Sequence, residues 1–210
     1  MKIPPSFGLY VILTDPVKGY EYMTKFFVDH RIACIQLRMK KESFRVIKTT
    51  AEKLRAITAN TSSLLIINDY PEIAAEVGAD GVHIGQTDRP YGEARMVMGP
   101  HAVIGLSTHS PEQTIAACIM RPDYIGIGPV YPTPTKEKAD PVIGITGLQT
   151  MLSAATVPAV AIGGIDLSNL REVLEAGAQN FCMMRQLMQA EHPEKVLREV
   201  EKIRNEYLVK

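Results

Sequence analysis

Short apolar runs in this chain of 210 residues are followed repeatedly by residue types that bind anions and divalent cations. These residues are Gln36, Arg38 and Lys40 after one run, Asn68 and Asp69 after the next, Asp88 after a third, Ser107 after a fourth, Thr133, Thr135 and Lys136 after a fifth, Gly164 after a sixth, and Met184 with Arg185 after the last. Two carboxylates among several cations suit a magnesium-bound polyphosphate, because Mg²⁺ takes one or two carboxylates plus phosphate oxygens. Arginine and lysine offset the remaining negative charge.

The apolar runs themselves predict the fold that brings these residues together. They cover residues 9–14, 33–37, 64–68, 81–85, 102–106, 124–128, 159–163 and 180–184, and segments with helical spacing lie between them. Continuous apolar strands that alternate with helices indicate a parallel sheet. Eight such units predict an α/β fold, a single-domain (β/α)8 TIM barrel over residues 1–210, with 1–8 as a short N-terminal extension. A doubly wound open sheet is the alternative, but no strand is followed by a GxGxxG motif or a P-loop.

A (β/α)8 barrel places the residues that follow its strands at one rim, where these enzymes carry out their chemistry. Backbone amides at Gly163 and Gly164 fall where such barrels commonly hold a phosphate group. The sequence therefore predicts two anionic substrates, small phosphorylated molecules, at this rim.

The ends of several helices are marked in the sequence. Ser110, followed by Pro111 and then Gln113, has the pattern of a capping box with proline at the first helical position. Gly78 and Gly177 each follow a helical stretch, where a left-handed residue often ends the helix. The segments "EVGADGVHI" and "EAGAQNFCM" around these two glycines resemble each other and indicate a repeated βα unit.

Composition excludes several other classes of function. Lysine plus arginine equals aspartate plus glutamate, at 23 each, so no overall basic field favours nucleic acid or an anionic membrane. No apolar run approaches the roughly 18 residues of a membrane span, and no secretory signal pattern is present, so we expect a cytoplasmic protein. The three cysteines are far apart and are expected to be buried free thiols. Whether the protein forms a homo-oligomer is left open.

Some of these polar residues have a structural interpretation as well as a functional one. Asp69 has the residue type that caps a following helix, and Asp88 has the type that closes a turn. His83, inside an apolar run, has the pattern of a hydrogen-bonded core histidine rather than a catalyst. The prediction of a site rests on the occurrence of so many polar residues at the ends of successive strands.

The motifs resemble those of a known family. "LYVILTD", "QLRMK", "LIINDY", "GADGVHIGQTD", "IGLSTH", "DYIGIGPVYPTPTK" and "VAIGGI" are similar, in order and spacing, to the motifs of thiamin-phosphate synthases (thiamine-phosphate pyrophosphorylases). The resemblance implies a (β/α)8 transferase of thiamine biosynthesis. Such an enzyme joins hydroxymethylpyrimidine diphosphate to hydroxyethylthiazole phosphate and releases pyrophosphate, with Mg²⁺ as cofactor.

The resemblance also implies a role for each matching residue. The pyrimidine diphosphate would be bound by Gln36, Arg38, Lys40, Asn68, Ser107 and Lys136, with Arg38, Lys40, Lys136 and Ser107 as the catalytic residues. The thiazole phosphate would be bound by Thr133, Thr135, Gly164, Met184 and Arg185. Asp69 and Asp88 would ligate the magnesium ion. A dissociative substitution needs no nucleophilic side chain, so the cations would stabilise the leaving pyrophosphate.

Two positions depart from the family pattern. Met39 occupies a place where the family usually has glutamate, and Arg185 occupies the place of the family's phosphate-binding serine. Arg185 would either grip the thiazole phosphate or fill the pocket with its bulk. A paralogue that binds thiazole phosphate or thiamin phosphate without turnover is therefore an alternative. A thiazole tautomerase is a weaker one, because Pro129 stands where that enzyme has a histidine.

Overall fold

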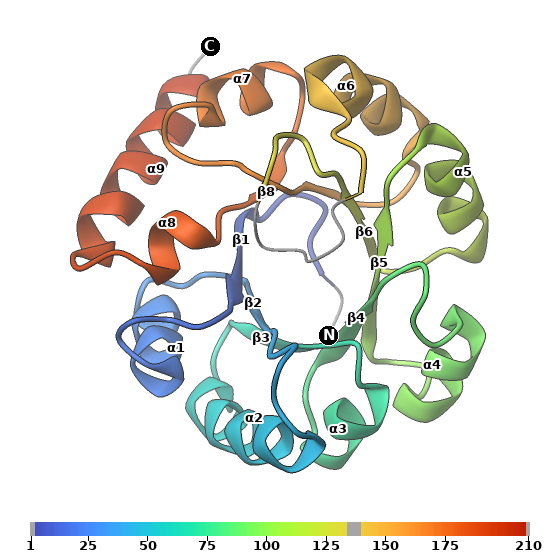
Figure 1. The fold of residues 1–210 in the computed structure, drawn as a ribbon, viewed down its shortest axis with the longest axis vertical. Helices are drawn as coiled ribbons and strands as arrows, with labels where there is room; N and C mark the ends of the chain where they lie inside the picture. The colour runs from blue at the N-terminus through green and yellow to red at the C-terminus, as the bar shows by residue number, and fades with distance from the viewer. Residues whose placement is uncertain (1–2, 134–139, 209–210) are drawn as a thin grey trace.

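The computed structural model describes residues 3–133 and 140–208, which form a closed barrel of eight parallel strands (Figure 1). The strands are β1 (Gly8–Leu13), β2 (Cys34–Leu37), β3 (Leu64–Asn68), β4 (Gly81–Ile84), β5 (Val103–Thr108), β6 (Tyr124–Ile127), β7 (Ala159–Ala161) and β8 (Asn180–Cys182). Each strand pairs with the next, and β8 pairs with β1. The predicted (β/α)8 barrel is therefore confirmed, and the open-sheet alternative is wrong.

Helices surround the barrel as an outer ring (Figure 1). Within the described residues they are α1 (Tyr20–Asp29), α2 (Phe44–Thr58), α3 (Pro71–Glu76), α4 (Tyr91–Met98), α5 (Pro111–Met120), α6 (Gly144–Ala154), α7 (Leu170–Glu175), α8 (Arg185–Met188) and α9 (Pro193–Leu208). The short α8 lies between β8 and α9, and it directly follows the last strand.

Alternation along each strand divides the core into two layers, because successive strand side chains point to opposite faces. On β1, Leu9, Val11 and Leu13 pack in the layer between the strands and the helices. Tyr10 and Ile12 belong to the cluster inside the barrel. Strands buried on both faces explain why the sequence shows continuous apolar runs rather than alternating ones.

The predicted helix ends are present, with one difference. Ser110 caps α5 by accepting a hydrogen bond from the backbone N–H of Gln113, and Pro111 is the first helical residue. The Gln113 side chain, however, accepts from the backbone N–H of His109 at 2.8 Å, one residue earlier than a capping box requires. The cap therefore also fixes the chain just after β5.

The repeated junction seen in the sequence is also a repeated structure. Gly78 and Gly177 both have a left-handed backbone, with φ of 66° and 98°. Each follows a six-residue helix, and the next residue, Ala79 or Ala178, donates its N–H back to Ala74 or Val173. These bonds satisfy carbonyl groups at the ends of α3 and α7. The two junctions lead into β4 and β8, four units apart in the barrel.

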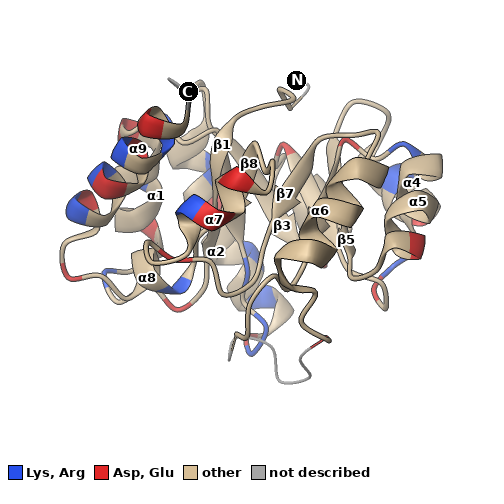
Figure 2. Ribbon diagram, turned by 90° about the horizontal axis from the view of Figure 1, so that it is seen from above, with Lys and Arg blue, Asp and Glu red and all other residues tan. Residues whose placement is uncertain are grey.

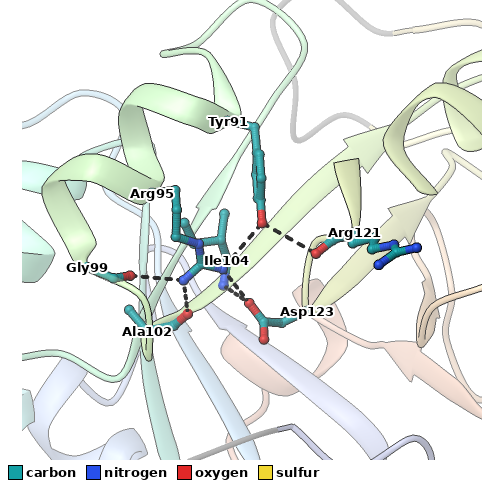
Figure 3. Close-up of polar contacts among 7 residues, drawn as sticks. All are labelled: Tyr91, Arg95, Gly99, Ala102, Ile104, Arg121 and Asp123. Atoms are coloured by element: carbon teal, nitrogen blue, oxygen red, sulfur yellow. Dashed lines mark hydrogen bonds and ion pairs between the residues drawn. The ribbon is translucent and has the colours of Figure 1, made fainter. Parts of the chain in front are cut away.

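A network of polar side chains fastens the end of the barrel where the strands begin (Figure 3). Asp123, which precedes β6, accepts hydrogen bonds from the Ile104 backbone N–H and from Arg95, each at 2.9 Å. Arg95 also donates to the carbonyls of Gly99 and Ala102. The network thus joins α4 to β5 and β6, at the end of the barrel that serves stability rather than chemistry.

The same arrangement occurs one pair of strands earlier. Asp80, which precedes β4, accepts from the Leu65 N–H of β3 and from Arg55 of α2. At the closing seam of the barrel, the Asn180 side chain accepts from the N–H groups of Phe7 and Gly8 and donates to the carbonyl of Pro5. Since β1 begins at Gly8, the N-terminal extension ends at residue 7 rather than at residue 8.

Charged residues lie mostly on the outer helices and the connecting loops (Figure 2). The three cysteines are buried free thiols, as expected. Among the described residues, no helix has the length and apolar composition needed to cross a membrane.

Candidate active site

A cavity of about 590 Å³ opens where the strands end. Six of the residues predicted to bind substrate line it, namely Arg38, Ser107, Thr133, Gly164, Met184 and Arg185. Gln36, Lys40, Asn68, Asp69 and Asp88 are not among its lining residues. Thr135 and Lys136 lie outside the described residues.

The wall of the cavity next to β6 and β7 depends on close approach between two loops. The backbone N–H groups of Val130 and Tyr131 donate to the carbonyls of Ile162 and Gly163 at 2.9 and 3.0 Å. A Cβ atom at Gly163 would lie 2.5 Å from the Cα of Pro129. A side chain at this position would therefore push the loops apart, and glycine is the residue that allows the contact.

Gly164 is restricted in a similar way. Its φ is 65°, a backbone conformation that residues with a side chain rarely adopt. A Cβ atom there would lie 2.7 Å from the Pro132 carbonyl oxygen. The Asn169 side chain donates to the Gly164 carbonyl at 2.9 Å, which fixes the loop from the other side.

Two arginines line the cavity, Arg38 after β2 and Arg185 after β8, and both of these strands pair with β1. Within residues 3–133 and 140–208, neither guanidinium forms a salt bridge. Burial lowers the pKa of Arg38, while the negative charges of Asp69 and Asp15 oppose this shift. A half-buried guanidinium without an ion-pair partner favours an anionic ligand in the cavity.

Lys40, Asp69 and Asp88 form a second cluster at the same rim. The Lys40 ammonium group forms a salt bridge with the Asp69 carboxylate, whose side chain is 14% exposed. Burial raises the pKa of Asp69 to about 6, Lys40 opposes this, and the nearby Asp88 carboxylate raises it further. A largely buried carboxyl group with a raised pKa, beside a second carboxylate, is a donor set that a divalent cation would stabilise.

Asp69 and Asp88 each had a possible structural role, as a helix cap and as a turn residue, and only the second role is present. Asp69 has φ of 66° and donates its N–H to the His83 carbonyl, and its side chain does not cap α3. Asp88 does close a turn, because its Oδ2 accepts from the Gly85 N–H at 2.7 Å. Its other carboxylate oxygen is not used in that turn. Within the described chain, no group of three or more His, Cys, Asp or Glu side chains could hold a metal ion. A cation here would need ligands from a substrate or from water.

Gln36 and Asn68 are more deeply buried than we expected for side chains that bind substrate. Gln36 is 2% exposed and donates its side-chain N–H to the Tyr10 hydroxyl at 2.9 Å. Asn68 is 9% exposed. His83 is the hydrogen-bonded core histidine that the sequence predicted, since it is 8% exposed and contacts Tyr124 and Ser107.

The sequence left the role of His109 open and predicted none for Asp166 and Gln186, and all three residues line the cavity. His109 lines it, with Nδ1 bonded to the Gly128 carbonyl and Nε2 3.5 Å from an Asp140 carboxylate oxygen. Asp166 and Gln186 also line it. The Asp166 Oδ1 already accepts from Ser168, and the Gln186 Oε1 accepts from the Leu167 N–H. The signal that could have identified them is their position in the segments that follow β5, β7 and β8.

Comparisons with known proteins agree on one family. The family described as "Thiamine monophosphate synthase" (TMP-TENI) matches residues 10–187. The chain is 41% identical over 189 residues to a thiamine-phosphate synthase of Halalkalibacterium halodurans, covering 89% of this chain and 90% of that protein. It is 42% identical to one of Gloeobacter violaceus, covering 79% of this chain but only 50% of the longer relative.

A solved structure agrees with these sequence matches. The thiamine phosphate pyrophosphorylase from Pyrococcus furiosus has a TM-score of 0.86 and 33% identity, with 96% of this chain and 97% of that chain covered. A 3-hexulose-6-phosphate synthase, at 15% identity and a TM-score of 0.68, shares the fold alone. The chain therefore belongs to the thiamine monophosphate synthase family, and the sequence prediction of a transferase enzyme is confirmed.

Proposed function

We propose that this protein is a thiamin-phosphate synthase. It would join hydroxymethylpyrimidine diphosphate to hydroxyethylthiazole phosphate, with release of pyrophosphate. The observation that carries the proposal is the cavity with Arg38 and Arg185 in its wall and the Asp69–Asp88 pair at the same rim. Membership of the family supports the same reaction.

The residues present fit a magnesium ion. The Asp88 carboxylate is close enough to Asp69 to raise the pKa of Asp69, and Mg²⁺ is bound by one or two carboxylates together with phosphate oxygens. When bound, the ion would supply positive charge that neutralises the diphosphate. Lys40 would then turn from Asp69 toward the phosphate oxygens, because its side chain is 48% exposed at the rim and is free to move.

The side chains of the site would act on the leaving group by charge. In a dissociative substitution, negative charge grows on the pyrophosphate before the thiazole nitrogen attacks. Arg38 and Lys40, with Lys136 as a further predicted cation, would stabilise that charge without moving a proton. The predicted thiazole-phosphate residues Thr133, Gly164, Met184 and Arg185 share the cavity wall, and Thr135 is proposed for the same role.

The direct test is product formation. Purified protein is incubated with both substrates and Mg²⁺, and thiamin phosphate and pyrophosphate are measured. We expect both products in equal amounts, and their loss when EDTA is added. Binding of thiazole phosphate without any product would instead support a paralogue that has lost turnover.

A further inference from the structure

Five hydrogen-bonded side chains cross the inside of the barrel and end at the cavity. Gln36 Nε2 lies 2.9 Å from the Tyr10 hydroxyl, which lies 2.7 Å from the Tyr124 hydroxyl. Tyr124 is 3.0 Å from His83 Nδ1, and His83 Nε2 is 2.9 Å from Ser107 Oγ. Ser107 lines the cavity, so the chain connects a buried amide to the binding site.

The order of donors along this chain is set at its buried end. Gln36 donates an N–H to the Tyr10 oxygen. Tyr10 has one proton, and within the described residues the other hydrogen-bond partner of its hydroxyl is Tyr124, so it donates to Tyr124. This order assigns the Tyr124 proton to its hydrogen bond with His83 Nδ1, at 3.0 Å. Burial raises the pKa of both tyrosines well above the usual value, so both hydroxyls keep their protons.

The position of the imidazole proton decides whether His83 or Ser107 donates in the hydrogen bond between them. A neutral imidazole whose Nδ1 accepts from Tyr124 carries its proton on Nε2. His83 therefore donates to Ser107 Oγ. The serine has then accepted a hydrogen bond from the protein, and its own O–H proton is available to the cavity.

We propose that Gln36, Tyr10, Tyr124 and His83 form a one-way hydrogen-bond chain that holds the Ser107 hydroxyl as a donor toward the bound ligand. The ligand group that faces Ser107 is then an acceptor, such as a ring nitrogen or a phosphate oxygen. His83 and the two tyrosines are positioning residues, because they act through Ser107. The identity of the ligand rests on the proposed function, but the direction of the chain does not.

The packing inside the barrel favours a fixed chain over a mobile one. Gln36, Tyr10 and Tyr124 are each 2% exposed or less. The His83 ring stacks on Tyr124 at a centroid distance of 5.5 Å. A Cβ atom at Gly105 would lie 2.5 Å from the Tyr124 hydroxyl, so the strand glycine leaves the space that this hydroxyl occupies.

The first experiment measures the histidine tautomer without any substrate. Protein labelled with ¹⁵N-histidine is examined by NMR, and the His83 signals are assigned with the variant His83→Gln. We expect Nε2 protonated and Nδ1 bare in the wild type. In Tyr124→Phe, the Nδ1 signal should move toward the average of the two tautomers. A wild-type His83 protonated on Nδ1, or unchanged signals in Tyr124→Phe, would overturn the proposal.

The second experiment measures the coupling between Tyr124 and Ser107 during turnover. Loss of one hydrogen bond should lower kcat/KM for the pyrimidine diphosphate about three- to tenfold in Tyr124→Phe. In a Ser107→Ala background, Tyr124→Phe should change kcat/KM less than about twofold, because the residue acts through the serine. An equal loss in both backgrounds would show that Tyr124 does not act through Ser107.

Tyr91→Phe is the matched control. It also removes a tyrosine hydroxyl that makes hydrogen bonds, but at the opposite end of the barrel (Figure 3). It should leave both the His83 signals and kcat/KM unchanged. If the protein makes no thiamin phosphate, the proposed function fails, while the tautomer measurement still tests the chain.

Discussion

Lys40 forms a salt bridge with Asp69, so a cation from the end of β2 and an acid from the end of β3 hold each other at the rim of the barrel. The Asp88 carboxylate raises the pKa of Asp69, and the charge of Asp69 in turn opposes the lowering of the Arg38 pKa by burial. Asp69 thus interacts with the two cations proposed to bind the diphosphate, Lys40 and Arg38. It also interacts with Asp88, the second carboxylate proposed to bind magnesium.

The ionisation of Asp69 should make the stability of the metal-free protein depend on pH. Its pKa is raised from 3.8 to about 6, so folding takes up a proton between these values. The free energy of unfolding should fall as pH rises through this window, and Asp69→Asn should remove that loss. The melting temperature of the variant minus that of the wild type should increase by roughly 5 °C between pH 4 and pH 8. Calorimetry in the presence of EDTA measures both values. The same difference at both pH values would contradict the raised pKa.

Arg185 should contribute to binding of the thiazole phosphate. Its guanidinium lines the cavity and forms no salt bridge within the described chain. Loss of a charge-assisted hydrogen bond in Arg185→Ser should raise KM for thiazole phosphate about tenfold or more, with a smaller change in kcat. Arg198→Ser, an exposed position of α9, is the control and should leave KM unchanged. An unchanged or lower KM in Arg185→Ser would show that Arg185 obstructs the pocket instead.

Gly164→Ala should impair activity through the loop between β6 and α6. The added Cβ would lie 2.7 Å from both the Pro132 carbonyl oxygen and the Tyr131 Cβ, at a φ of 65°. We expect a loss of at least tenfold in kcat/KM and a destabilisation of about 1 kcal/mol or more. Gly92→Ala in α4, where nothing lies within 4 Å, is the matched control and should be neutral or slightly stabilising. Wild-type kinetics in Gly164→Ala would mean that the loop can move without cost.

Arg95→Leu should destabilise the protein without changing KM. Arg95 joins Asp123 to the carbonyls of Gly99 and Ala102 at the end of the barrel far from the cavity (Figure 3). Its removal leaves Asp123 without this partner, so we expect a loss of about 2 kcal/mol in urea unfolding. Lys25→Met removes an exposed salt bridge with Asp29 and should cost less than about 1 kcal/mol. A comparable loss of stability in the two variants would mean that the Arg95 network contributes no more than an exposed ion pair.

The sequence predicted the fold because each strand is buried on both faces and each connection is marked at its ends. Strands β3 and β4 begin at the predicted residues, whereas β7 and β8 end two residues early, after Ala161 and Cys182. They end early because the chain there turns into the loops that line the cavity. Six predicted binding residues line the cavity since the carboxyl ends of parallel strands share one rim.

The hydrogen-bond chain inside the barrel could not be predicted in the same way. Tyr10 and Tyr124 lie on β1 and β6, which are not neighbours in the sheet. Their contact depends on the diameter of the closed barrel and on the space left by Gly105. Neither quantity is visible in the local pattern of residues, so Gln36 was assigned only a role toward substrate.

The left-handed backbone at Asp69 has a consequence for mutational surveys of this family. Aspartate and asparagine tolerate that conformation, whereas alanine bears a strain of about 1 kcal/mol there before any ligand is considered. An alanine scan would therefore merge a folding defect with the loss of a metal ligand. Exchange for asparagine separates the two, because it keeps the chain path and alters the charge alone.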